Sequence, residues 1–365
     1  MINCVNSTNF VDDFPNMTRK YSIFAILLLT LLTGCKAVVM NPSGDVAVQQ
    51  SNLILVSTLL MLIIIVPVIV LTLYFGWRYR HTNTKATYSP EWDHSTGLEL
   101  MIWGAPLLII IFLGLVTWIT THTLDPYRPL QRLDAERVIP AEAKYLNVEV
   151  VALDWKWLFI YPDLGIATVN ELAAPVDMPI RFKITASTVM NSFYIPALAG
   201  QIYAMPAMET KLHAVINHEG DYEGFSANYS GAGFSHMNFK FHGMTQGNFD
   251  AWVQANKSSN LELNPKAYLT LEQPSIKDPI QHFGKVTPNL FEQVVNRCVD
   301  DKKMCMDKMM AIDAHGGLSM GGISAVATKP AFNIFNEKSP TPMKRYVVSQ
   351  LCTTKEPNVP VTTHD

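Results

Sequence analysis

The stretch that decides the fold is Gly224-Phe225-Ser226-Ala227-Asn228-Tyr229-Ser230-Gly231-Ala232-Gly233-Phe234-Ser235-His236-Met237, and a partner segment, Val189-Met190-Asn191-Ser192-Phe193, lies about thirty residues upstream. Serine and asparagine dominate the polar positions of both segments, and neither contains a cysteine. A serine hydroxyl is a hard ligand that stays protonated at neutral pH, unlike a thiolate. These segments are therefore not expected to bind soft metal ions.

The spacing of these residues resembles the binuclear-copper loop of haem-copper oxidase subunit II. In that family two cysteines, two histidines, a methionine and a glutamate carbonyl hold two copper ions. The resemblance places serines at the cysteine positions, Asn191 and Phe234 at the histidine positions, and an asparagine at the glutamate position. The six corresponding positions here are Asn191, Ser226, Asn228, Ser230, Phe234 and Met237. Only the methionine is retained, so the loop keeps the frame of a copper site without its ligands.

Loss of the ligands points to one branch of the family, the subunit II of cytochrome bo-type ubiquinol oxidases. Three further segments support this resemblance: Asp154-Trp155-Lys156-Trp157, Gly165–Glu171 and Gln201–Met205. It extends from about Cys35 to Val295. It implies a subunit without its own redox centre in a proton-pumping terminal oxidase, which oxidises ubiquinol and reduces oxygen to water. The implied partners are subunit I, which carries the haems and the remaining copper, and smaller membrane subunits.

Composition fits a membrane protein better than a soluble one. Of the 365 residues, 48% are hydrophobic and only 16% are charged, and the apolar residues gather near the N-terminus. The net charge of −3 gives no electrostatic case for nucleic acid binding. No nucleophile–base pair, phosphate loop or zinc spacing is present, so we do not expect catalysis by this chain alone.

The N-terminal region has the pattern of a lipoprotein signal peptide, expected at residues 1–34. A basic pair, Arg19 and Lys20, precedes the apolar run Tyr21–Leu31 and the lipobox Leu32-Thr33-Gly34-Cys35. We expect lipid on Cys35, a palmitate-bearing anchor, and a true start at Met17. The alternative is a first transmembrane anchor in which Cys35 is incidental, but the apolar run is short for a bilayer span.

Residues 35–125 are expected to form a transmembrane helical hairpin in the bacterial inner membrane. Leu53–Tyr74 and Leu100–Ile119 are each about the twenty apolar residues that a spanning helix requires. Basic residues in the connecting loop favour a cytoplasmic loop, although three arginines also follow the second run. Lipidation of Cys35 occurs on the outer face, which puts both ends of the mature chain outside.

Glu99 lies at the start of the second apolar run, on the expected cytoplasmic side. An ionisable residue there is a functional candidate, and the resemblance implies that it marks the entrance of a proton channel leading into subunit I. The alternative is a capping box formed by Thr96-Gly97-Leu98-Glu99, since an acid is favoured at a helix N-terminus.

Residues 146–255 are expected to form a periplasmic all-β domain, for which the resemblance implies a cupredoxin-like β-sandwich. Short β-branched or alternating segments separated by turn residues support this fold class. The expected strands include Asn147–Leu153, Pro179–Thr185, Thr210–Asn217 and Met237–Phe241.

Aromatic and histidine residues near the loop have two interpretations each. Trp155 and Trp157 form a stripe that suits a core; in the absence of copper we interpret them as a docking surface for subunit I. Four histidines lie near the loop in sequence: His213, His218, His236 and His242. They could form a different metal site, but solvated side chains are the expectation.

The C-terminal region is expected to contain a helical quinol-oxidase segment at 256–300 and a flexible Met-rich tail at 301–365. Four methionines surround Cys305, and a copper-sensing tail is the alternative because thioethers suit Cu(I). The simplest disulfide is Cys298–Cys305, although Cys352 leaves other pairings open.

Two other functions remain open from sequence. One is a cytochrome c oxidase subunit with true electron entry, which the missing thiolates disfavour. The other is a free-standing membrane-anchored copper-handling or scaffold lipoprotein, which the two-helix hairpin disfavours because a lipid anchor alone would hold a scaffold.

Overall fold

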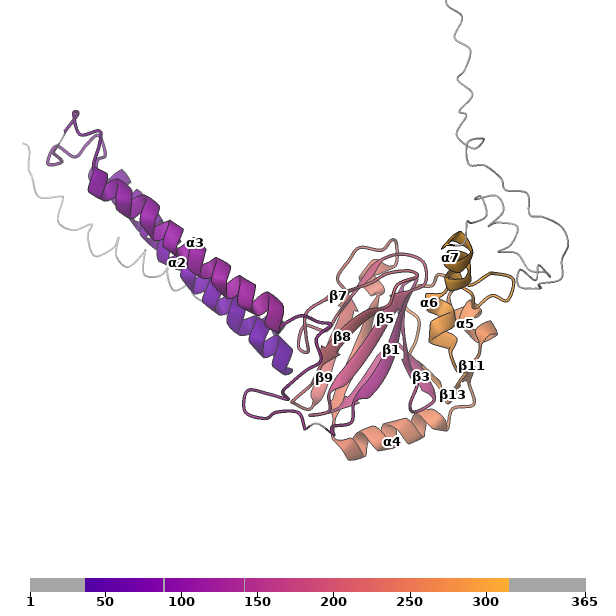
Figure 1. Cartoon of the computed structure of the whole chain (residues 1–365). Coiled ribbons are helices and arrows are strands. Elements are labelled where there is room, and N and C mark those ends of the chain that lie inside the picture. The colour runs from indigo at the N-terminus through magenta and orange to yellow at the C-terminus, as the bar shows by residue number, and fades with distance from the viewer. Residues whose placement is uncertain (1–36, 88, 141, 315–365) are drawn as a thin grey trace, which may run out of the picture.

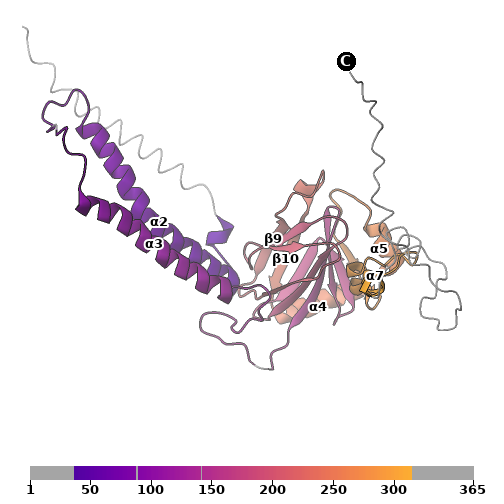
Figure 2. The same ribbon diagram turned by 45° about the horizontal axis from the view of Figure 1, so that its top comes forward.

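A computed structural model of the chain describes residues 37–314 except 88 and 141. Figure 1 shows a long helical hairpin attached to one end of a β-sandwich, with small helices of the C-terminal region on the opposite side. The turned view in Figure 2 shows the same arrangement. The expected signal peptide, Met17, Cys35 and the tail beyond residue 314 lie outside the described residues.

The hairpin consists of α2 (Asp45–Arg78) and α3 (Thr96–Thr123), preceded by a short 3-10 helix, η1 (Val38–Met40). Both helices are long and apolar enough to cross a membrane, and the most apolar window of each is not buried within the chain. At 1.5 Å per residue, the 34 residues of α2 span about 51 Å, well beyond the ~30 Å of a bilayer's hydrocarbon core. The helix is therefore longer than a bilayer crossing requires.

Two sheets face each other in the outer domain. The first has the order β12-β3-β2-β1-β5-β8 and the second the order β4-β10-β9-β6-β7. Strands of the first sheet are β1 (Leu146–Leu153), β2 (Lys156–Tyr161), β3 (Ile166–Val169), β5 (Ile180–Ala186), β8 (Thr210–Ala214) and β12 (Gln281–Phe283). Those of the second are β4 (Glu171–Pro175), β6 (Asn191–Tyr194), β7 (Ile202–Ala204), β9 (Gly220–Ser226) and β10 (Asn238–Met244). The sandwich expected from sequence is confirmed.

Strands β2 and β3 of the first sheet are buried on both faces, which explains their nearly continuous apolar sequence, whereas β5 keeps an alternation of buried and partly exposed residues. On β1, Val148 and Val150 face the core between the two sheets, whereas Val151 and Leu153 belong to a second core under the C-terminal region. β2 alternates in the same way: Trp157 packs edge-on against Phe193 and Phe239 of the second sheet. Every residue of β2 is buried as a result.

The C-terminal region differs from the helical segment expected at 256–300. Its helices are α4 (Gln246–Lys257), α5 (Pro265–Leu271) and α6 (Leu290–Val295), but it also contributes β12 to the first sheet, and β11 (Glu262–Leu263) pairs with β13 (Lys285–Val286). These strands are two or three residues long, too short to produce a visible alternation in sequence. A further helix, α7 (Met306–Ala314), lies where a flexible tail was expected. A disulfide joins Cys298 to Cys305, the pairing considered simplest from sequence.

One buried charge ties this region to the sandwich. The Lys156 ammonium is 2% exposed and lies 2.9 Å from the Asp278 carboxylate. It also donates to the Gln273 carbonyl at 2.9 Å and to the Ser275 hydroxyl. All three partners belong to the loop between α5 and β12. The pair therefore fixes that loop against the turn that joins β1 to β2.

Replacing Lys156 with methionine should destabilise the outer domain by about 2 kcal/mol, because the partly exposed Asp278 carboxylate loses its charged hydrogen-bond partner. The measurement is denaturant unfolding of the full chain in detergent, followed by near-UV circular dichroism. The matched control is Lys285→Met, which removes an exposed lysine 3.4 Å from Glu262 and should change stability by less than about 0.5 kcal/mol.

The same pair gives a pH dependence. Burial alone would raise the pKa of Asp278, but hydrogen bonds from Ser275 and Lys156 outweigh it and hold that pKa below its ordinary value. This contribution to stability is present above the unfolded-state pKa of about 4 and is lost as pH falls through the lower folded-state pKa. Equal destabilisation by Lys156→Met and Lys285→Met would contradict the conclusion that Lys156 fixes the loop between α5 and β12.

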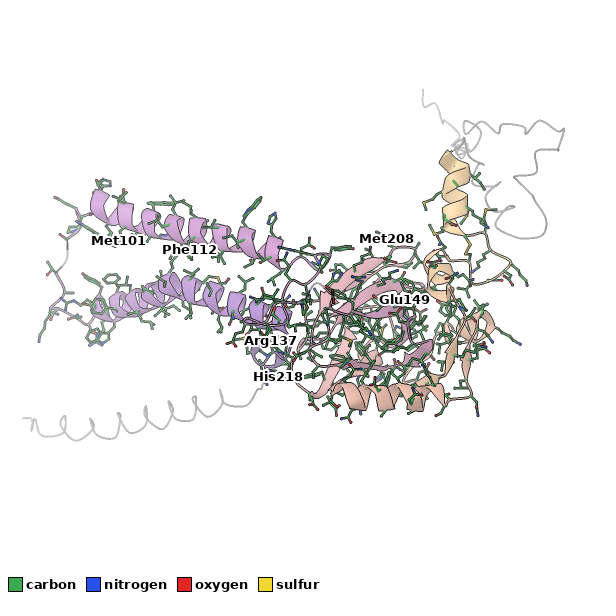
Figure 3. All side chains as sticks on the ribbon, turned by 60° about the horizontal axis from the view of Figure 1, so that its bottom comes forward. Met101, Phe112, Arg137, Glu149, Met208 and His218 are labelled. Carbon is green, nitrogen blue, oxygen red and sulfur yellow. A yellow bond between two sulfur atoms is a disulfide. The ribbon has the colours of Figure 1, made fainter. Side chains whose placement is uncertain are left out.

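Glu149 lies on β1 (Figure 3) and should have the opposite pH dependence. Burial, opposed in part by Lys183, raises the pKa of Glu149 to about 7. The folded state therefore binds the proton more tightly, and the cost of the carboxylate grows as pH rises from about 4 to about 7.

Glu149→Gln should stabilise the chain on the order of 1 kcal/mol at pH 8, a value reduced because solvent screens this half-buried group. The gain should vanish near pH 4.5, as measured by unfolding at both pH values. A gain independent of pH would contradict this account, and exposed Glu219→Gln is the control.

Candidate functional site

The loop between β9 and β10 and the start of β6 come together at one end of the second sheet. Strand β9 pairs with β6, so that Ser226 lies opposite Phe193, and with β10, so that Phe225 lies opposite Asn238. This pairing brings Asn191 beside Ser226 although 35 residues separate them. The two segments that the resemblance relates to one copper site are therefore adjacent in space.

Ser226 is the centre of the hydrogen bonds in this loop. Its Oγ lies 3.2 Å from Asn191 Oδ1 and 3.2 Å from the Asn228 carbonyl oxygen, and it accepts the Ser192 N–H at 3.4 Å. Ser226 and Asn191 are 3% and 1% exposed. A buried hydroxyl or amide is costly without partners. The Ser226 hydroxyl and the Asn191 side-chain oxygen therefore serve as hydrogen-bond partners for each other.

The remaining positions are occupied in the same self-contained way. Asn228 donates its Nδ2 to the Met190 carbonyl at 3.2 Å, and Ser230 Oγ lies 4.0 Å from the buried Met237 sulfur. Phe234 presents a ring to Tyr229, with 5.6 Å between centroids. Polar groups that would face a metal are thus bonded to one another.

Trp155 covers the loop from the β1–β2 turn. Its indole donates to the Ser230 carbonyl at 3.1 Å, and its ring lies where a Cβ on Gly231 or Gly233 would come within 2.9 or 2.5 Å. Trp155 has a φ of 116°, a conformation that is strained for a residue with a bulky side chain. Glycines at 231 and 233 therefore allow the indole to lie directly on the loop.

The loop does not fit a binuclear copper centre. Its donors are protonated hydroxyls and neutral amides, with Met237 as the one soft ligand, whereas such a centre needs thiolates and imidazoles. Over residues 37–314, gaps at 88 and 141 aside, no group of three or more His, Cys, Asp or Glu side chains is arranged to hold a metal ion. The arrangement suits a structural end of the sandwich.

Trp157 was predicted to form docking surface, and this is wrong. The side chain is fully buried between the two sheets, because the chain reverses at Trp155 and alternation along β2 then turns Trp157 inward. Trp155 is half-buried on its own loop, and its contact with subunit I stays a prediction.

The histidines near the loop are only partly solvated. His218 and His236 are exposed. His213 is 5% exposed and bonds the Pro126 carbonyl at 3.1 Å through Nδ1. Burial lowers the pKa of His213. The prediction of a solvated side chain is therefore wrong for His213.

A carboxylate cluster escaped the sequence analysis. Glu171 accepts from His282 at 2.8 Å and from the Trp252 indole at 3.2 Å, and lies 3.4 Å from His242. His242 also lies 2.5 Å from Asp221, so it is not simply solvated. These residues belong to β4, α4, β9, β10 and β12. Their separation of up to 111 residues leaves no spacing signal in the sequence.

Glu99 lies in the first turn of α3, at the end of the hairpin far from the sandwich (Figure 1). The predicted capping box is wrong: the N-cap is Ser95, one residue earlier, and its side chain makes no capping hydrogen bond. The half-exposed Glu99 carboxylate instead lies 2.8 Å from His94 Nδ1. The carboxylate is therefore accessible to solvent at this end of the hairpin.

Restoring the missing ligands should create the copper site, because β6, β9 and the loop between β9 and β10 already bring the six positions to one end of the sheet. The substitutions are Asn191→His, Ser226→Cys, Asn228→Glu, Ser230→Cys and Phe234→His. Metal analysis should find two copper ions per restored chain, with near-infrared absorption, and none in the unaltered chain. The matched control omits Ser226→Cys. Tightly held copper in the unaltered chain would contradict the reading of this loop.

Comparison with known proteins agrees with the geometry. Residues 164–243 match the family described as cytochrome c oxidase subunit II, periplasmic domain, and residues 257–302 match the COX Aromatic Rich Motif. The chain is 46% identical over 279 residues to cytochrome bo(3) ubiquinol oxidase subunit 2 of Pseudomonas putida, covering 76% of this chain and 86% of that protein. It is 50% identical to ubiquinol oxidase subunit 2 of Acetobacter aceti, covering 76% and 87%. It is also 48% identical to cytochrome bo(3) ubiquinol oxidase subunit 2 of Pseudomonas aeruginosa PAO1, covering 73% of this chain and 78% of that protein. The chain therefore belongs to the ubiquinol oxidase subunit 2 family.

Proposed function

We propose that this chain is the non-redox subunit II of a proton-pumping ubiquinol oxidase in a bacterial inner membrane. The complex oxidises ubiquinol and reduces oxygen to water. One observation carries the proposal: the loop that holds copper in cytochrome c oxidases is here closed by hydrogen bonds around Ser226. Family membership supports the same assignment.

Electrons do not enter the complex through this chain in this proposal. The loop offers hydroxyls, amides and a phenyl ring at the copper-ligand positions, and none of these groups changes oxidation state at physiological potentials. The haems and the remaining copper belong to subunit I, and smaller membrane subunits complete the assembly. This chain packs against subunit I and shields its outer face.

The proposed orientation places the sandwich in the periplasm and the loop between α2 and α3 in the cytoplasm. Arg78, Arg80 and Lys85 lie at that loop, in agreement with the preference of short cytoplasmic loops for basic residues. A lipid on Cys35 belongs to the same proposal. Ten positions separate Cys35 from Asp45, where α2 starts, and the residues just before Asp45 are hydrogen-bonded to the sandwich. A mass spectrum of the mature N-terminus tests the lipid.

Glu99 is the proposed proton entrance. The carboxylate is half-exposed on the cytoplasmic end of α3, and His94 beside it can exchange protons with it across 2.8 Å. A carboxylate–histidine pair at a membrane surface can collect protons for a neighbouring channel. The channel itself would lie in subunit I.

The affinity-purified complex should consume oxygen on ubiquinol and not on reduced cytochrome c. In this proposal the chain has no copper centre that could accept electrons from cytochrome c. A donor that cannot reach the quinol site in the membrane therefore cannot reduce the complex. Oxygen uptake with each donor is the measurement. Fast uptake on cytochrome c would support the cytochrome c oxidase alternative, and purification without any haem-bearing partner would support a free-standing lipoprotein.

The proton role has a separate measurement in the same preparation. In vesicles, Glu99→Gln should lower proton pumping several-fold while leaving the choice of electron donor unchanged. Glu91→Gln, in the loop that precedes α3, is the matched control. Unchanged pumping in Glu99→Gln would remove the entrance from the proposal without affecting the quinol assignment.

A further inference from the structure

A cavity of about 380 Å³ lies where the helical hairpin meets the sandwich. Three elements surround it: the start of α2, the end of α3 with the connector that follows, and β8 with the segment before β7. The residues that matter for its chemistry are Asp45, Gln49, Asp125, Arg128, Arg132 and His213. None of the six positions that correspond to copper ligands lines this cavity.

The cavity lies at the height of the lipid headgroups. Gln49 precedes the apolar run that starts at Leu53 by four residues, and Thr123 follows the run that ends at Ile119 by four residues. Four helical residues rise about 6 Å, and the headgroup layer extends roughly 5 to 7 Å beyond the hydrocarbon core on each side. Both helical walls of the cavity therefore lie within this layer.

The wall nearest the sandwich is a fixed ion pair. Asp45 is 4% exposed, and its two oxygens accept from Nε and Nη2 of Arg132 at 3.0 and 3.1 Å. Gln49 donates to the same carboxylate at 2.8 Å. The Arg132 side chain remains 41% exposed, so its outer edge faces the cavity region and water. A guanidinium held in this way is oriented before any ligand arrives.

The rim of the cavity carries one positive and one negative side chain, Arg128 and Asp125, and both are exposed. The exposed Arg128 makes a long 3.4 Å contact to the His122 carbonyl, and Asp125 is exposed. The lining thus carries two guanidiniums and two carboxylates. His213 adds no charge near neutral pH, because burial lowers its pKa. A pocket with no net charge but with separated charges suits a zwitterion better than a simple anion.

We propose that this cavity binds the headgroup of one outer-leaflet phospholipid of the phosphatidylethanolamine class. The phosphodiester lies between Arg128 and the outer edge of Arg132, and the ammonium lies toward Asp125. Guanidinium forks bind phosphate oxygens in a bidentate manner. The acyl chains then run down the exposed apolar surface of α2 and α3. The bound lipid would seal the joint between membrane hairpin and sandwich.

The test is native mass spectrometry of the delipidated, detergent-purified complex titrated with dioleoyl phosphatidylethanolamine. The unaltered complex should retain one tightly bound lipid that Arg128→Gln releases at roughly tenfold lower concentration of competing detergent. Arg128→Lys should fall between the two, because it keeps the charge and loses the fork. Arg128 is exposed, so none of these variants should disturb folding.

Two controls make the result decisive. Arg80→Gln removes the same charge at the other end of α2, outside the cavity, and should leave this lipid bound. Soluble glycerophosphoethanolamine should bind far more weakly than the lipid. Equal retention by Arg128→Gln and the unaltered complex would overturn the proposal, as would equal loss in Arg80→Gln. Binding of the soluble headgroup as tightly as the lipid would show a site for a free phosphodiester instead.

Discussion

The buried ammonium of Lys156 is the interaction on which the outer domain depends. A lysine on a strand whose other side chains are apolar is stable only if every donor finds an acceptor. Asp278, Ser275 and the Gln273 carbonyl supply them from the C-terminal region. The loop that carries these acceptors continues into β12, which pairs with β3. The C-terminal region is therefore part of the first sheet, and the outer face of that sheet depends on it for cover.

The adjacent residue in the same turn acts on the other side of the sandwich. Trp155 accepts a strained backbone and places its indole over the loop that ends in Met237. Beneath it, Ser226 and Asn191 form a hydrogen bond of modest strength at positions where the copper-binding relatives have metal ligands. A metal centre would fix this end of the sandwich by coordination. Here the indole and a closed set of hydrogen bonds keep the loop in place, and the one turn that carries Trp155 and Lys156 contacts both this loop and the C-terminal region.

Features set by residues close together in the sequence were predictable, whereas features set by residues far apart in the sequence were not. The apolar runs of α2 and α3 and the alternation at Ile180–Ala186 are local, so the hairpin and the sandwich were predictable. The six loop positions were recognisable because their spacing is a motif. Trp157 was misplaced because the reversal at Trp155 shifts the alternation of β2 by a turn that sequence does not mark. The Glu171 cluster joins residues up to 111 positions apart, and only the sheet order brings them together.

The hairpin and the sandwich are joined by backbone as well as by charge. The N–H groups of Ser43 and Gly44 both donate to the Ala197 carbonyl at 2.9 Å, and Gly44 bridges to Ile216. A Cβ at Gly44 would lie 2.5 Å from the Val215 carbonyl oxygen, so glycine is required for this approach. The first turn of α2 is thus fixed to the sandwich before the helix enters the membrane. These contacts restrict rotation of the sandwich relative to the first turn of α2, and with it the position of the loop under Trp155 relative to the hairpin. Such a constraint is what the proposed role requires, because a subunit that holds a fixed surface against a partner must keep that surface in one orientation.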